Sequence, residues 1–145
     1  MAVTWQAGPW VADTSAWARA SDPAVADAWV AAAGAEELVA CPIVTLELLY
    51  AARDAGQVEQ LAGACAALRQ APVTRRVTDT AMQAVRELAA GGADGSHRVR
   101  IPDVLVAAAA AERGFGVLHY DRHFDRLAEV LPFASQWVAP PGTID

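Results

Sequence analysis

Short apolar segments alternate along the chain with longer segments that have helical periodicity. Strands that are apolar throughout are typical of a parallel sheet covered on both faces, so the alternation predicts an α/β protein with a mainly parallel sheet of four to five strands. The predicted strands cover residues 9–13, 37–42, 71–74, 116–120 and 135–139. A predicted helix begins at residue 14, and others cover residues 23–33, 43–54, 56–69, 77–90, 102–113 and 122–130. The segment 91–98, GGADGSHR, is predicted as a mobile loop.

The composition indicates one globular domain spanning residues 1–145, because 54% of the residues are hydrophobic and only 19% are charged. No apolar run approaches the roughly 18 to 20 residues of a membrane span, and the start MAVTWQAGPW lacks the features of a secretory signal. We therefore expect a cytoplasmic protein. Cys41 and Cys65 show no zinc-binding spacing, so two reduced core thiols are expected.

The charged residues narrow the chemistry that the chain can perform. A formal net charge of −6 argues against broad coating of nucleic acid, but a metal site is itself a concentration of negative charge, so a nuclease is still allowed. All 11 basic residues are arginine. The absence of lysine excludes the P-loop, Schiff-base chemistry and any other mechanism that needs a lysine.

Two acidic residues stand directly after predicted strands. Asp13 closes the first strand in VADTSAW, and Asp121 closes the fourth in VLHYDRHF. Each also precedes a predicted helix, so helix capping alone would explain either residue. In open parallel sheets, however, ligands bind at the carboxyl ends of the strands, which makes both residues candidates for a functional site.

Two further carboxylates lie on apolar helix faces. In PIVTLELLYAA, Glu47 has Val44 and Ala51 as neighbours at helical spacing, and an unpaired carboxylate there needs a partner, a proton or a metal ion. Asp103 heads the apolar segment IPDVLVAAAAAERG, and its neighbours at helical spacing, Val106 and Ala107, are apolar. The alternatives are an ion pair with an arginine for Glu47 and a favourable interaction with the helix N-terminus for Asp103.

A parallel sheet would gather these four acids at its carboxyl edge. Close like charges repel unless a cation lies between them, and carboxylates without a His or Cys ligand set favour a hard cation such as Mg²⁺ or Mn²⁺. Such an ion activates water and stabilises the charge that builds up on a phosphate. The acids therefore predict metal-assisted cleavage of phosphodiester bonds.

The same segments resemble the PIN-domain ribonucleases, and within them the VapC toxins of bacterial toxin-antitoxin pairs. The resemblance rests on VADTSAW, TLELLYAAR, IPDVLVAAAA and VLHYDRHFDRLAEV, which occur in the family's order and with family-like separations. It implies a PIN-like three-layer α/β/α sandwich and an endoribonuclease, dependent on Mg²⁺ or Mn²⁺, that cleaves tRNA, rRNA or mRNA. It also implies a homodimer and inhibition by a cognate VapB-type antitoxin.

The resemblance also assigns roles to individual residues. The implied catalytic metal ligands are Asp13, Glu47, Asp103 and Asp121. Thr14 would hold these ligands in place without binding the metal ion itself. Asp125 is a further candidate ligand, and the alternative for it is a solvated surface residue. Members often carry Thr or Ser in place of His119 and a further Asp in place of His123, which puts the occupancy of a second metal in doubt.

Binding of RNA requires groups beyond the acids. His119 or His123 could contact substrate, although a satisfied histidine is the plainer interpretation. Arg113 and Arg122 are placed near the acidic edge, where an arginine fork would suit a phosphate, while surface charge explains either residue equally well.

Two other functions are weighed against the nuclease toxin. One is a PIN-like binding or regulatory module without turnover, which four intact acids disfavour. The other is a carboxylate-metal phosphoesterase that acts on another substrate. Such phosphatases commonly use an Asp-x-Asp arrangement and a Lys, whereas this chain offers Asp13-Thr14-Ser15 and no Lys.

Overall fold

Five parallel strands form the centre of the molecule. The computed structural model describes residues 2–92, 95 and 97–145, so parts of the predicted 91–98 loop lie outside the described residues. The sheet has the order β3-β2-β1-β4-β5, and every neighbouring pair is parallel, which confirms the predicted α/β class. The strands are β1 (Trp10–Ala12), β2 (Leu38–Ala40), β3 (Arg69–Gln70), β4 (Gly116–His119) and β5 (Ser135–Trp137).

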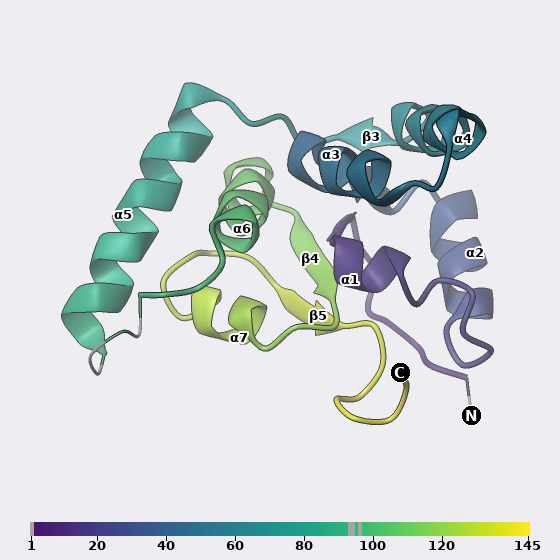
Figure 1. Cartoon of the computed structure of the whole chain (residues 1–145). Helices are drawn as coiled ribbons and strands as arrows, with labels where there is room; N and C mark the ends of the chain where they lie inside the picture. The colour runs from purple at the N-terminus through teal and green to yellow at the C-terminus, as the bar shows by residue number, and fades with distance from the viewer. Residues whose placement is uncertain (1, 93–94, 96) are drawn as a thin grey trace.

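Helices cover both faces of this sheet, as the predicted three-layer sandwich requires. In Figure 1, α5, α6 and α7 lie on one side of β4 and β5, whereas α1 and α2 lie on the other. The helices are α1 (Thr14–Trp17), α2 (Ala26–Gly34), α3 (Pro42–Ala51), α4 (Ala55–Ala66), α5 (Arg75–Gly91), α6 (Ile101–Arg113) and α7 (His123–Leu127). Among the described residues, no helix has both the length and the apolar character needed to cross a bilayer.

Alternate side chains of the central strands belong to two separate hydrophobic cores. Val11 of β1 pairs in register with Val39 and Val117, and all three contribute to the larger core, which α5, α6 and α7 also build. Trp10 and Leu118 belong to the second core, on the side of α1 and α2. This division follows from the period of two along a strand, and it explains why the strands are apolar at every position.

Helix α6 is the most deeply buried helix segment. The side chains from Val106 to Ala110 are all 0% exposed, so this stretch is apolar all round because it is enclosed on every side. Pro102 stands in the first turn, where its missing N–H costs nothing, and Gly114 ends the helix with a left-handed φ of 70°. Since α6 runs antiparallel to the strands, its N-terminus lies at their carboxyl edge.

The third strand is the element that the sequence analysis placed wrongly. Residues 71–74 were expected to form it, but β3 consists of Arg69 and Gln70, which pair with Val39 and Ala40. Both residues are exposed, because β3 is an edge strand with β2 on one side only. Residues 71–74 instead lead into α5, whose first turn is capped by the Thr74 hydroxyl.

Candidate active site

Asp13 is fixed at the carboxyl end of β1 by its backbone and its side chain. Its N–H donates to the Leu118 carbonyl at 2.9 Å, which continues the pairing of β1 with β4. Its Oδ2 accepts hydrogen bonds from the backbone N of Ser15 at 3.0 Å and from Ser15 Oγ at 2.6 Å. The Asp13 side chain therefore caps the N-terminus of α1, which confirms the helix capping considered from the sequence. Burial raises the pKa of Asp13, against the lowering effect of Ser15, and the charge of Glu47 raises the pKa further.

Asp103 is a second buried carboxylate and lies in the first turn of α6, with 2% of its surface exposed. Burial raises the pKa of Asp103 to about 6, while a hydrogen bond with His123 lowers it; the nearby charges of Asp13 and Asp121 raise it. The charges of Asp13 and Asp121 thus act on Asp103 at the carboxyl edge of the sheet, and that of Arg100 acts against them. A cation between them would relieve the cost of their ionisation.

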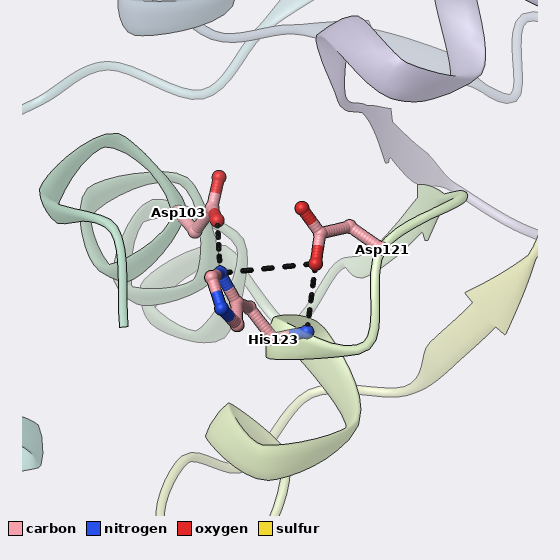
Figure 2. A group of neighbouring side chains, drawn as sticks. All are labelled: Asp103, Asp121 and His123. Carbon is pink, nitrogen blue, oxygen red and sulfur yellow. Dashed lines mark hydrogen bonds and ion pairs between the residues drawn. The ribbon is translucent and has the colours of Figure 1, made fainter. Parts of the chain in front are cut away.

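Asp121 and His123 complete a compact group with Asp103, which Figure 2 shows. The backbone N of His123 donates to Asp121 Oδ1 at 2.9 Å. The ring atom Nδ1 of His123 lies 3.0 Å from Asp103 Oδ2 and 3.7 Å from Asp121 Oδ1. One donor atom from each residue falls within 4.8 Å of the others, an arrangement that can hold a metal ion.

Glu47 approaches this group from α3 and has two partners of its own. Its Oε1 accepts a hydrogen bond from Thr14 Oγ1 at 3.0 Å, and its Oε2 lies 3.3 Å from Arg100 Nη2. The ion pair considered for Glu47 is thus formed, with Arg100 as the cation. The side chain is 28% exposed and does not converge with Asp103, Asp121 and His123 among the described residues. Thr14 ties it to the segment that carries Asp13.

His119 lies behind the acidic edge and contacts the neighbouring loop through hydrogen bonds. Its Nδ1 accepts from the backbone N of Asp121 at 3.1 Å, so its Nε2 carries the proton that faces Ser135 Oγ at 2.7 Å. Ser135 Oγ in turn donates to Asp125 Oδ1 at 2.8 Å. Burial lowers the pKa of His119 to about 4, against the charges of Asp125 and Asp121. His119 is 0% exposed and accepts a hydrogen bond from the Asp121 backbone, which fits a supporting position behind the acids better than contact with substrate.

Two other candidates lie away from the acidic group. Asp125 is turned toward β5, where its Oδ2 accepts from Trp137 Nε1 at 2.9 Å. Arg113 was predicted near the acidic edge, but it follows Asp103 by ten residues on the same helix, a rise of about 15 Å. Arg113 therefore lies at the opposite end of α6, so its expected place near the acidic edge is wrong, whereas contact with substrate stays a prediction.

Three residues at the site were missed or undervalued by sequence reasoning. Ser15 donates to Asp13, Arg100 pairs with Glu47, and His123 faces two carboxylates. The Asp-Thr-Ser pattern already indicated that Ser15 could lie near Asp13, because an N-cap side chain bonds to the following turn. Glu47 is 53 residues from Arg100, and Asp103 is 20 residues from His123, so no local pattern could reveal these two contacts. The other partner of His123, Asp121, is only two residues away.

Replacement of Asp125 tests whether this residue supports β5 or binds metal. We expect Asp125→Ala to lower the free energy of unfolding by about 1 kcal/mol, because Ser135 and Trp137 lose their acceptor. Stabilisation by Mn²⁺ should be unchanged. Urea denaturation with and without Mn²⁺ measures both effects, and Glu129→Ala, at an exposed position nearby, is the matched control. Loss of the Mn²⁺ effect in Asp125→Ala would instead make Asp125 a ligand.

Comparison with known proteins places this geometry in a family. The sequence profile of the PIN domain matches residues 11–130. Ribonuclease VapC18 of Mycobacterium tuberculosis is 39% identical over 132 residues, which cover 91% of this chain and 96% of the relative. Ribonuclease VapC51 of the same organism is 39% identical over 133 residues, which cover 92% and 95%.

Solved structures show the same fold. The crystal structure of VapBC2 from Rickettsia felis, bound to a DNA fragment from its promoter, matches with a TM-score of 0.68 at 14% identity over 88% of this chain and 97% of that chain. The parallel sheet with acids at its carboxyl edge is thus a PIN fold. The chain belongs to the PIN domain family, among its VapC-type members, which confirms the resemblance seen in the sequence.

Proposed function

We propose that the protein is a metal-dependent endoribonuclease that cleaves RNA phosphodiester bonds, with residues 1–145 as a single catalytic domain. The observation that carries this proposal is the convergence of buried carboxylates at the sheet edge of a VapC-type chain. Asp13 and Asp103 both have a raised pKa because of burial, and each is affected by the charge of a neighbouring acid. A binding module without turnover has no use for so costly a group.

The donor chemistry of the site fits a divalent cation, Mg²⁺ or Mn²⁺. The candidate ligands are the acids Asp13, Glu47, Asp103 and Asp121. A bound ion of this kind supplies a water of lowered pKa and stabilises negative charge on a phosphate. The remaining residues prepare the site for it: Ser15 orients Asp13, Thr14 orients Glu47, and Arg100 offsets part of the negative charge.

The partners proposed for this chain follow from its relatives. The relatives VapC18 and VapC51 carry the name ribonuclease, and two similar solved structures are complexes named VapBC. We therefore propose an RNA substrate, which is a tRNA, an rRNA or an mRNA, and a VapB-type antitoxin that inhibits cleavage. We further propose a homodimer that acts in the cytoplasm as the toxin of the pair.

Metal binding by the full chain provides the first test of this function. With Mn²⁺ at about 100 times its dissociation constant, stabilisation of about 2.7 kcal/mol is expected, a rise in Tm of about 8 °C. Asp13→Asn should remove this shift, and RNA cleavage should require the added ion. A thermal scan and a cleavage assay on total RNA measure the two effects. RNA cleavage that persists in excess chelator would contradict the proposal.

A further inference from the structure

We infer that His123 is a metal ligand through Nδ1 and that it makes this site select Mn²⁺ over Mg²⁺. The inference rests on the proposed function and deepens it, because it concerns which ion the nuclease takes. The sequence analysis assumed a site of oxygen ligands without histidine. The structure instead places an imidazole nitrogen between two of the predicted carboxylate ligands.

The separations between the three donor atoms are those of neighbouring ligands around one ion. Ligands at about 2.1 Å from an octahedral ion lie about 3.0 Å from one another. His123 Nδ1 lies 3.0 Å from Asp103 Oδ2, which matches that separation. In the metal-free chain this contact is a hydrogen bond, and a bound ion would replace it, with the proton of the neutral imidazole on Nε2. It lies 3.7 Å from Asp121 Oδ1, a distance that a small rotation of either side chain would shorten.

The backbone holds the imidazole where an ion would need it. His123 is the first residue of α7, and its N–H donates to Asp121 Oδ1 at 2.9 Å, so the two residues are fixed relative to each other. In Figure 2 the ring lies between the α6 turn that carries Asp103 and the loop that carries Asp121. The His123 side chain is 30% exposed, whereas that of Asp103 is 3% exposed. An ion from solvent could therefore reach the group from the side of His123.

The alternative is that His123 is itself the cation that balances Asp103. The local charge argues against this role. Asp13 and Asp121 act on Asp103 as further negative charges, and Arg100, the cation that acts against them, already pairs with Glu47. One positive charge on His123 would balance only one of the three negative charges on Asp13, Asp103 and Asp121, whereas a divalent ion bound to a neutral imidazole balances two of them.

A nitrogen ligand changes the preference of the site among divalent ions. Mg²⁺ takes oxygen ligands and gives up its water reluctantly, whereas imidazole suits the first-row transition metals. With one histidine among carboxylates, we expect Mn²⁺ to bind at least about 10-fold more tightly than Mg²⁺. The substitution of a histidine where other members often carry an acid therefore alters metal choice while leaving the site able to bind an ion.

The test compares the full chain with its His123→Asp and His123→Gln variants, each freed of metal by chelation. Titration calorimetry gives the Mn²⁺ and Mg²⁺ dissociation constants, and pulsed EPR of the Mn²⁺ complex detects coupling to a ligand ¹⁴N nucleus. We expect ¹⁴N coupling in the native chain and its loss in both variants. His123→Asp should also lower the preference for Mn²⁺ about 10-fold, by weakening Mn²⁺ binding relative to Mg²⁺ binding.

The control is His97→Gln, which removes a histidine beside α5 and α6 that does not belong to the acidic group. It should leave both dissociation constants and the EPR signal unchanged. Mn²⁺ binding without ¹⁴N coupling in the native chain would overturn the role of His123 and leave the proposed nuclease intact. If neither Mn²⁺ nor Mg²⁺ binds the folded native chain, the proposed function is overturned as well. If His123→Asp does not fold, the EPR spectrum of the native chain still decides.

Discussion

Asp103→Asn is expected to abolish RNA cleavage, with a loss of about 10³-fold. The substitution keeps the volume of the side chain but removes the charge of a proposed metal ligand from the acidic group, next to His123 and close to Asp121. Loss of several kcal/mol of charge stabilisation in the transition state corresponds to a rate loss of this size. Cleavage of total RNA by the purified variant measures the effect. Induced expression of the native chain without antitoxin should arrest growth, and Asp103→Asn should relieve the arrest.

The same substitution should make the metal-free protein more stable. Because burial raises the pKa of Asp103 from 3.8 to about 6, ionisation of this group destabilises the folded chain as the pH rises through that window. Asn carries no charge, so at neutral pH the variant should gain about 2 kcal/mol of unfolding free energy in the presence of chelator. The difference between variant and native chain should shrink toward zero as the pH falls below about 4.

Urea denaturation in chelator at acid and neutral pH measures this gain. Asp27→Asn, which neutralises an exposed acid in the first turn of α2, should leave activity unchanged and should lower stability at neutral pH by no more than about 1 kcal/mol, opposite in sign to the gain expected for Asp103→Asn. Retained Mg²⁺- or Mn²⁺-dependent cleavage by Asp103→Asn would remove Asp103 from the metal site. A variant that is inactive and also less stable at neutral pH would show that Asp103 is needed for folding.

Gly116→Ala is expected to destabilise the fold by about 3 kcal/mol. A Cβ at this position would lie 2.5 Å from Trp10 Cε3 and 2.9 Å from the backbone oxygen of Ala134. Neither group can move easily, because Trp10 is 4% exposed in the second core and Ala134 precedes β5. Overpacking of this kind costs about 1 to 3 kcal/mol or more. Urea denaturation of the full chain measures the loss.

The control for this prediction is Gly63→Ala, in the interior of α4, where an added Cβ meets no atom within 4 Å. This variant should gain about 0.5 to 1 kcal/mol, because alanine is the better helix former. The double variant Gly116→Ala, Trp10→Leu should be more stable than the sum of the two single effects, since the smaller side chain leaves room for the Cβ. Strict additivity of the two changes would contradict the clash between residues 10 and 116.

The fold could be predicted where side-chain pattern decides the structure. Strands β1, β2 and β4 are buried on both faces, so each appears in the sequence as an apolar run. The edge strand β3 escaped detection because it is held by backbone pairing with β2, and Arg69 and Gln70 need no apolar character at an exposed edge. Backbone hydrogen bonds do not depend on side-chain type, so a strand of two residues that is held by such bonds shows no hydrophobic pattern in the sequence.

The acidic group was predictable from topology, but its internal contacts were not. Asp13 and Asp121 end strands and Asp103 begins a helix that runs back along the sheet, so a parallel sheet brings them to one edge. The direction of α6 also places Arg113 at the far end, which the sequence analysis did not take into account. The position of His123 depends on the turn after β4 and on the ring orientation, neither of which follows from sequence spacing.

The order of the acids along the chain has a consequence for how a cell makes this protein. Asp13, Glu47, Asp103 and Asp121 come from four separate segments of the chain. Because β1 pairs with β4 as well as with β2, the acidic edge is incomplete until the segment with β4 has been synthesised. At about 5 to 20 residues per second, the ribosome takes several seconds to pass from the first acid to the fourth. A nascent or prematurely terminated chain that ends before residue 121 lacks part of the acid set, so the proposed nuclease activity can arise only when most of the polypeptide exists.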